Sequence, residues 1–288
     1  MPSLTYPPSA TRGRYGTALV PGTLRSDHTL ACVTPSALDA GVSRRLHLDF
    51  AHQSFLPPGV TLLGDAFVDR GVLELTSAMH HEHGALLITA TDTTRTDPWP
   101  WARFELRVKV YIGDGEWFCT YDEAKGGRVC GGEGFSFSYG ALPTASLGQL
   151  GAGSGLRVVF HTGPRNGPAI DVSYDHVRIQ RRALVHLTTT GSSGDGGGGL
   201  SAGWPRGTWV NLRIAYDSFD SPGGLLLERD GHFDFRALPV PGWAPQREWK
   251  MALAATTGLA VDRHLFDDLV LSTDALIRPA RVEVEVSA

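Results

Sequence analysis

The feature that most restricts the fold of this chain is a repeated alternation of apolar and polar residues. In ARFELRVKVYI, Phe104, Leu106 and Val108 alternate with charged side chains, which places the apolar groups on one face of an extended strand. Glycine or proline separates this run from others like it, at a spacing of about ten to fifteen residues that is typical of antiparallel β-structure. The other runs are RLHLDF, GVLELT, EGFSFSYG, LRVVF, AIDVSYDHVRI, WVNLRIAYD, GGLLLERDG, WKMALAATTG, DDLVLST and RVEVEVS.

A strand that is apolar on one face must bury that face, so this many strands need two packed sheets or a barrel. The glycine-rich segment GSSGDGGGGLSAG, residues 191–203, lacks side chains for a core and is interpreted as a flexible loop that holds no strand. Neither half of the chain beside it closes a sandwich alone, so the sequence predicts one domain over residues 46–288. Residues 1–45, with prolines at positions 2, 7, 8 and 21, are predicted to form an irregular N-terminal arm.

The charge composition argues against nucleic acid as a partner. The chain has 26 basic and 30 acidic residues, and its formal net charge of −4 gives no attraction for a polyanion. No apolar run approaches the about 18 residues that cross a bilayer, so no membrane span is expected. Residues 1–26 hold three arginines and no apolar stretch, and they are not expected to act as a secretory signal.

Three cysteines, Cys32, Cys119 and Cys130, are too few for a disulfide framework. Cys119 and Cys130 flank the polar loop TYDEAKGGRV, and a hairpin of the flanking segments would bring the two thiols close enough to bridge. Two free thiols in a reducing compartment are an equally good interpretation, so both remain open.

Two short motifs receive structural interpretations. HHEH places His80, His81 and His83 in a loop between two strands. Because no cysteine or positioned fourth ligand accompanies them, they are interpreted as an exposed polar loop rather than a metal site. PWPW, residues 98–101, is interpreted as a rigid turn that sets two indoles against the next strand, with a protein contact as the alternative.

The sequence shows no catalytic motif. A glycoside hydrolase needs two carboxylates about 5–9 Å apart on either side of the bond. Glu283 and Glu285 share a strand face but alternate with valines, and they are interpreted as a solvated sheet face. Asp267 and Asp268 are adjacent and therefore point to opposite faces. Since a nucleophile elbow, a P-loop and a dinucleotide fingerprint are also missing, an enzyme is not expected.

Five segments occur in an order that resembles a known family. They are LLGDAFVDRGVLELT, GGEGFSFSYG, GSGLRVVFHTGPRNGPAIDVSYDHV, TWVNLRIAYD with GGLLLERDG, and MALAATTGLAVDRHLFDDLVLST. In this order they resemble strands of the legume-type (L-type) lectins, in the concanavalin A-like lectin/glucanase superfamily; GGEGFSFSYG, for example, is similar to the family's G-D-G-F-A-F strand. The resemblance implies an all-β, antiparallel two-sheet jelly-roll sandwich for residues 46–288.

The metal site of this family is not matched by the sequence. In legume-type lectins, a calcium ion and a transition metal lie under the sugar site and are held by carboxylates and a histidine. The family's glutamate and aspartate fall at Val159 and His161 here, and its histidine falls near Gly167. A valine cannot ligate a metal, and Asp171 alone does not make a site. The resemblance, with these departures, predicts that no metal and no cofactor is bound.

The resemblance also implies where a sugar would bind. Glu133 falls at the family's sugar-binding aspartate and Asn166 at a sugar-contacting asparagine. Glu133 is also open to a plainer interpretation, as a solvated turn residue between glycines. The candidate ligand-binding residues are Glu133, Gly132, Asn166, Gly167 and Tyr139. The aromatic side chains that could stack on a sugar are Tyr139, Trp117, Trp204 and Trp243, although tryptophans in a sandwich more often belong to the core.

Two functions follow from these observations. The first is a non-catalytic, metal-independent carbohydrate-binding module whose partner is a glycan. The alternative is a lectin-like scaffold that binds protein partners within a larger assembly, with the N-terminal arm extended in a groove of the partner. The resemblance implies an extracellular location, whereas the lack of a recognisable secretory signal leaves an intracellular assembly open.

Overall fold

The computed structural model describes residues 12–15, 18–26, 29–33, 44–52, 55–89, 101–113, 120–122, 127–129, 133–145, 147–162, 168–187, 200–202, 204–217, 223–246, 248–258, 261–275 and 281–285. Within these ranges the regular elements are all β-strands, and no helix has the length and apolar character needed to cross a membrane. The strands form two compact units. The larger is Arg44–Thr273, and the smaller combines Met1–Ser43 with Asp274–Ala288.

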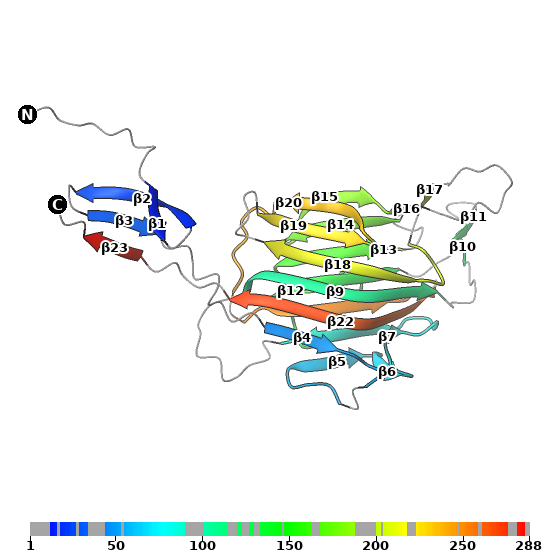
Figure 1. The fold of residues 1–288 in the computed structure, drawn as a ribbon. Helices are drawn as coiled ribbons and strands as arrows, with labels where there is room; N and C mark the ends of the chain where they lie inside the picture. Colours follow the sequence, from blue (N-terminus) through cyan, green and yellow to red (C-terminus); the bar gives the residue numbers. More distant parts are fainter. Residues whose placement is uncertain are drawn as a thin grey trace, which may run out of the picture. The chain divides into compact units, whose positions relative to one another are not determined.

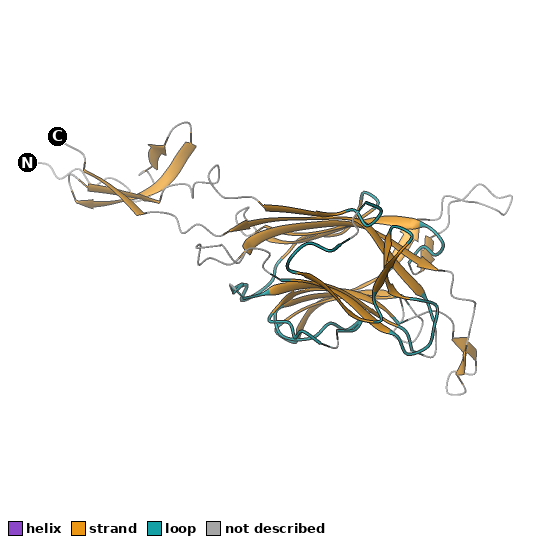
Figure 2. Ribbon diagram, turned by 90° about the horizontal axis from the view of Figure 1, so that it is seen from below, coloured by secondary structure: helices purple, strands orange, loops and turns teal. Residues whose placement is uncertain are grey.

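The larger unit contains two antiparallel sheets that pack face to face (Figure 1 and Figure 2). The seven-stranded sheet has the order β15 (Val177–Ala183), β14 (Ala169–Tyr174), β13 (Leu156–His161), β12 (Gly134–Gly140), β21 (Lys250–Thr256), β8 (His83–Ile88) and β5 (Val60–Gly64). The eight-stranded sheet has the order β20 (His232–Leu238), β19 (Gly224–Arg229), β18 (Trp209–Asp217), β9 (Trp101–Gly113), β22 (Arg263–Ala275), β7 (Val72–Thr76) and β6 (Phe67–Asp69), with β4 (Arg44–Leu48) also paired to β22. The two-sheet sandwich predicted from the sequence is confirmed.

Aromatic side chains of β12 and β9 meet in the core between the two sheets. Phe135, Phe137 and Tyr139 are at most 1% exposed. The ring of Phe104 in β9 lies 5.4 Å from that of Phe137 and 5.5 Å from that of Tyr139, measured between centroids. These contacts confirm that the alternation in EGFSFSYG turns its aromatic residues toward the core.

A smaller apolar cluster covers part of the outer face of the seven-stranded sheet. Leu142 and Leu147, from the segment that follows β12, pack on Ala85 of β8 and on Ala252 and Ala254 of β21. The segment between β12 and β13 therefore covers the middle of this face, and it also reaches the strand end, where the backbone N–H of Gln149 donates to Oγ1 of Thr256 at 2.9 Å.

The smaller unit is one four-stranded sheet in the order β1 (Arg12–Tyr15), β2 (Ala18–Ser26), β3 (Thr29–Val33) and β23 (Arg281–Glu285). The sequence predicts an irregular arm over residues 1–45 and assigns residues 274–288 to the sandwich, and the structure differs on both points. Proline excludes a helix more strongly than a strand, and Pro21 lies within β2. The pairing of β3 with β23 joins segments that are remote in sequence, so no local pattern indicates it.

Two short hairpins complete the described elements. The first pairs β10 (Thr120–Asp122) with β11 (Gly127–Val129), as considered for the cysteine loop, while Cys119 and Cys130 themselves lie outside the described residues. The second pairs β16 (Val185–Leu187) with β17 (Leu200–Ala202). Because β17 lies inside the glycine-rich segment, the expectation that residues 191–203 hold no strand is wrong for residues 200–202. Of the PWPW motif, the described part is Trp101, which begins β9.

Candidate functional site

One end of the seven-stranded sheet gathers polar residues from four neighbouring strands. Gly134 begins β12 and pairs with His161 of β13 and with Thr256 of β21. Thr256 in turn pairs with His83, the first residue of β8. Glu133 is half-buried and directly precedes this row. The antiparallel order therefore brings the loops that border these four strands to the same end of the sheet, where the strands begin or finish.

The entry of the chain into β12 depends on a glycine. Gly134 has φ of +120°, and a Cβ at this position would lie 1.9 Å from the carbonyl oxygen of Phe160. Only glycine combines that backbone conformation with so close an approach to the neighbouring strand. The constraint on Gly134 fixes the position of Glu133 beside it.

The side chain of Glu133 lies against Gly258, which follows β21. A Cβ on residue 258 would come within 2.4 Å of Oε1 of Glu133. The carbonyl oxygen of Gly258 accepts a hydrogen bond from the backbone N–H of His81 at 3.4 Å, and Nδ1 of His80 lies 3.2 Å from the same oxygen. A carboxylate and two histidines thus surround a single glycine at the strand end.

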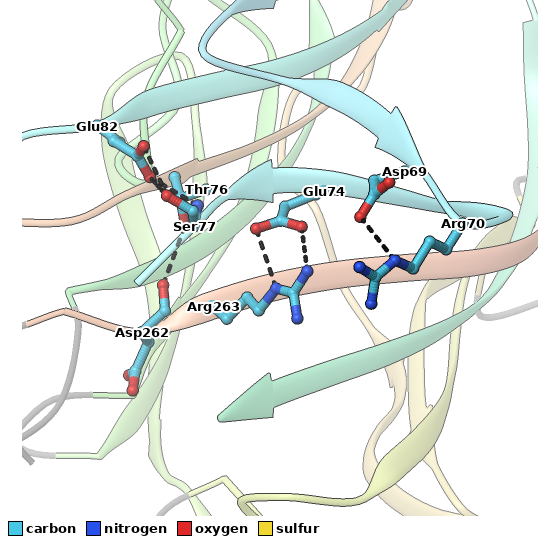
Figure 3. A network of polar contacts seen from close by, with 8 residues as sticks. All are labelled: Asp69, Arg70, Glu74, Thr76, Ser77, Glu82, Asp262 and Arg263. Carbon is cyan, nitrogen blue, oxygen red and sulfur yellow. Dashed lines mark hydrogen bonds and ion pairs between the residues drawn. The ribbon is translucent and has the colours of Figure 1, made fainter. Parts of the chain in front are cut away.

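Thr257 ties the HHEH loop to the segment that follows β21. Its hydroxyl donates to the carbonyl of Met79 at 2.6 Å, and its backbone N–H donates to the carbonyl of Glu82 at 3.0 Å. The backbone N–H of Glu82 donates to Oγ1 of Thr257 at 3.0 Å. The carboxylate of Glu82 also accepts hydrogen bonds from the backbone and the hydroxyl of Ser77 (Figure 3). Two loops from different strands are therefore held as one body.

Ion pairs anchor the chain where it enters β22. Asp262 is fully buried, and Arg206 donates to both of its carboxylate oxygens, with Nη2 at 2.9 Å from Oδ2. The next residue, Arg263, donates two hydrogen bonds to the buried Glu74, at 3.0 and 2.6 Å (Figure 3). Paired charges of this kind tolerate burial because each oxygen keeps a partner.

A neutral histidine lies beneath the same segment. Oγ1 of Thr76 lies 2.7 Å from Nδ1 of His264. The same hydroxyl donates to the carbonyl of Asp262 at 3.2 Å, a contact drawn in Figure 3. Burial lowers the pKa of His264 to about 4. Since the single hydroxyl proton of Thr76 goes to the carbonyl, Nδ1–H of His264 is the donor to Thr76. A chain of hydrogen bonds therefore links the core to the loop.

Asp171 lies between two basic side chains on the outer face of the seven-stranded sheet. Nε2 of His161 lies 2.9 Å from Oδ2 of Asp171, and Nη1 of Arg181 donates to the same oxygen at 2.6 Å. Because His161 pairs with Gly134, this cluster adjoins the row that holds Glu133. We call the three side chains the His161–Asp171–Arg181 cluster.

The donor set near this cluster does not fit the two metals that the resemblance implies. Val159 offers no ligand atom, and the carboxylate of Asp171 is already bound by a guanidinium. A divalent cation would have to displace Arg181 to reach it. In the part of the chain that the structure describes, no three His, Cys, Asp or Glu side chains come close enough together to hold a metal ion.

Of the residues predicted for sugar binding, the half-buried Glu133 lies at the strand end, whereas Tyr139 lies in the core. Tyr139 is 1% exposed in the core, where its ring lies 5.1 Å from that of Trp249. A sugar cannot stack on a ring that both sheets cover, so this assignment is wrong. Gly132, Asn166 and Gly167 lie outside the described residues.

The other aromatic and histidine candidates are also located. Trp204 is buried in the core, Trp243 stacks on Tyr216 with 3.8 Å between centroids, and Trp117 lies outside the described residues. His80, His81 and His83 are exposed, as the interpretation of the HHEH motif expects; His80 and His81 lie in the loop, whereas His83 is already the first residue of β8.

Neither Gly258 nor the pair of Arg206 and Asp262 was predicted from the sequence. Gly258 stands in MALAATTGLAVDRHLFDDLVLST, two residues after the end of β21, and a glycine shortly after a strand was the signal available there. Arg206 and Asp262 are 56 positions apart, so nothing local to either residue indicates their contact.

Comparison with known proteins finds similarity in structure alone. No family model matches the sequence, and no curated protein matches it significantly. The carbohydrate recognition domain of Emp47p superposes with a TM-score of 0.52 at 12% identity, covering 81% of this chain and 95% of that one. The metal-free Emp46p carbohydrate recognition domain superposes with a TM-score of 0.52 at 14% identity, covering 78% of this chain and 94% of that one. The exoplasmic/lumenal domain of VIP36 in its Ca²⁺/Man2-bound form has a TM-score of 0.52 and 14% identity, and the match covers 84% of this chain and 96% of that one.

The chain has a concanavalin A-like fold. It is the fold of L-type lectin carbohydrate recognition domains, as the order of the five sequence segments predicted. At identities of 12–14% these superpositions establish the fold alone, and the ligand has to be argued from the residues at the strand end.

Proposed function

We propose that the larger unit is a non-catalytic, lectin-like carbohydrate-binding module whose glycan site is the strand end around Glu133. The similar structures include domains described as carbohydrate recognition domains. The observation that carries the proposal is the carboxylate of Glu133 held against Gly258, at the edge where four strands end. A carboxylate accepts strong hydrogen bonds from sugar hydroxyls, and Gly258 leaves the room that the carboxylate itself occupies.

We further propose that this module binds its glycan without a metal ion. The His161–Asp171–Arg181 cluster adjoins the Glu133 row and holds its carboxylate with protein cations. Thr257 and the Arg206–Asp262 pair fix the neighbouring loops through hydrogen bonds and ion pairs. In this proposal these contacts give the site its shape, and a metal is not needed for it.

The test is a glycan array probed with the full chain, with and without chelator. Binding to a glycan that persists in chelator and is lost in Glu133→Ala supports both parts of the proposal. Glu248→Ala is the matched control, because Glu248 is an exposed glutamate outside the site. An array without any bound glycan, or binding that the chelator abolishes, contradicts the proposal in this form.

A second function, a scaffold for protein partners, is favoured by the small unit. Its strand order leaves β1 and β23 at the two edges of a four-stranded sheet. Edge strands carry backbone groups that can pair with an added strand. Co-purification with the full chain and with residues 44–273 tests this function. Partners retained equally by both exclude the small unit as the binding element.

A further inference from the structure

The outer face of the eight-stranded sheet is hollowed. The hollow has a volume of about 610 Å³, and its lining comes from β4, β9, β18, β19 and β22. In β9 the even-numbered residues from Phe104 to Ile112 are buried in the core, so the odd-numbered ones face this surface. The hollow thus lies on the sheet that does not contain Glu133. Its volume falls in the range of about 300–1,000 Å³ that small ligands occupy.

Two separate groups of hydrogen-bonded side chains include residues that line the hollow. Nζ of Lys109 lies 2.7 Å from Oδ2 of Asp268, and Nε2 of His47 lies 3.6 Å from Oδ1 of the same carboxylate. The hydrogen bond from Lys109 lowers the pKa of Asp268, and the hydrogen bond to Asp268 raises the pKa of Lys109, so both groups stay charged near neutral pH. The amide of Asn211 donates to Asp230 at 2.9 Å.

A second line of charges lies beside the first. Arg213 donates to Glu105 at 2.7 Å and to Glu228 at 3.3 Å, from one strand to its neighbours on either side. Arg107 also contacts Glu105, at 2.5 Å. Partial burial raises the pKa of Glu105. The hydrogen bonds and charges of Arg213 and Arg107 outweigh this effect and bring that pKa below its ordinary value. These side chains are held in place before any ligand arrives.

The charges on this surface balance. Among the described side chains, those that line or directly contact the lining are the cations Arg45, Arg107, Lys109 and Arg213 and the anions Glu105, Glu228, Asp230 and Asp268. Four positive charges against four negative ones give no net attraction for a polyanion or a polycation. The surface instead offers many donors and acceptors, which suits a neutral ligand that is rich in hydroxyl groups.

An aromatic pair continues the same face. Trp209 and Tyr111 are opposite each other in β18 and β9, two residues beyond Asn211 and Lys109, and their ring centroids are 5.5 Å apart. Trp209 is 39% exposed. An indole that is partly open to solvent beside a polar hollow provides an apolar surface for the C–H face of a pyranose ring, while the polar groups meet its hydroxyls.

We propose that this hollow is a second saccharide site, specific for a neutral oligosaccharide that stacks on Trp209 and hydrogen-bonds to Asn211, Arg213, Glu228 and Asp268. The site is independent of the strand end around Glu133, because the two lie on different sheets. This proposal can therefore be tested independently of the proposed function.

The experiment measures binding of the full chain to neutral oligosaccharides of glucose, mannose, galactose and N-acetylglucosamine, with an oligouronate as the acidic probe. We expect one neutral oligosaccharide to bind Glu133→Ala, and Trp209→Ala to weaken that binding about tenfold, the size of a lost aromatic contact. Asn211→Ala is expected to weaken it as well, and Val177→Ala, an exposed control on the other sheet, is expected not to.

Four outcomes overturn the proposal. In the first, Glu133→Ala binds no neutral probe, and in the second, binding is unchanged in both Trp209→Ala and Asn211→Ala. In the third, the oligouronate binds more tightly than the neutral probes. In the fourth, the chain self-associates through this face, and Trp209→Ala disrupts that association with no effect on saccharide binding. If wild-type binding is lost in Trp209→Ala and kept in Glu133→Ala, the second site stands and the proposed function fails. If wild-type binding is lost in Glu133→Ala and kept in Trp209→Ala, the proposed function stands and the second site fails.

Discussion

The carboxylate of Glu133 lies so close to Gly258 that a Cβ at residue 258 would approach its Cδ to 3.0 Å and its Oε1 to 2.4 Å. The two residues come from loops that border different strands, β12 and β21, and each loop is fixed by its own contacts. Gly134 fixes the first through its backbone, and Thr257 fixes the second through hydrogen bonds. The position of the carboxylate is thus set by both loops together.

Gly258→Ala is expected to displace the carboxylate of Glu133 and to weaken glycan binding by at least tenfold while the domain stays folded. The physical reason is that the added methyl group takes the space of Oε1, and the far end of a flexible side chain moves more easily than two anchored loops. Binding is measured by calorimetry and folding by far-ultraviolet circular dichroism. Full affinity in the folded variant would show that Glu133 does not contact the glycan.

Calcium and chelator are expected to leave the melting temperature unchanged. A metal that binds the native state stabilises it in proportion to the logarithm of its concentration over its Kd, so a bound metal reveals itself as a shift. Here Arg181 and His161 already hold Asp171, which pairs with Val159 across β14 and β13. Thermal unfolding in millimolar calcium, in chelator and in plain buffer provides the measurement. A higher melting temperature in calcium would contradict metal independence.

Arg206→Ala is expected to lower the free energy of unfolding by about 2–3 kcal/mol, because it leaves the fully buried carboxylate of Asp262 without its partner. The value lies below that of a fully buried pair, since the side chain of Arg206 is 37% exposed and solvent screens it. Arg206→Lys should restore part of the loss. Denaturant titration gives the free energy, and Arg178→Ala, on the exposed edge strand β15, is the control with little expected effect. Equal losses in the two alanine variants would argue against the ion pair.

Acid is expected to destabilise the sandwich between pH 6.5 and about 4 through His264. Its pKa is lowered from 6.5 in the unfolded chain to about 4 in the fold, so the unfolded chain binds more protons in this window. Stability from this group is present above pH 6.5 and is lost as the pH falls to about 4, by about 3 kcal/mol in total. Denaturant titrations across this range measure the slope, which should flatten in His264→Gln. If that variant fails to fold, the ring can be titrated directly by NMR in the native protein, and a pKa near 6.5 would refute the prediction.

The sandwich and its core could be predicted because they depend on alternation along single strands. EGFSFSYG turns Phe135, Phe137 and Tyr139 to the same side, and the structure buries all three. The same alternation argues against a sugar role for Tyr139, a candidate because an aromatic ring can stack on a sugar. The burial of its ring excludes that role.

The contacts that shape the site could not be predicted in the same way. Glu133 meets Gly258 only because β12 pairs with β21, and Arg206 meets Asp262 across 56 positions of sequence. Composition and periodicity determine which side of a strand faces the core. They do not determine which strands become neighbours, and the pairing of strands is what brings the loops together at one end of the sheet.

The pairing of β3 with β23 has a mechanical consequence. The sandwich is inserted, along the chain, between two strands that are hydrogen-bonded to each other in the small sheet. Tension applied to the segments before β1 and after β23 would be carried by the backbone hydrogen bonds between β3 and β23. Until those bonds open, none of that load reaches the sandwich, so the small sheet would act as a clasp that isolates the lectin fold from force.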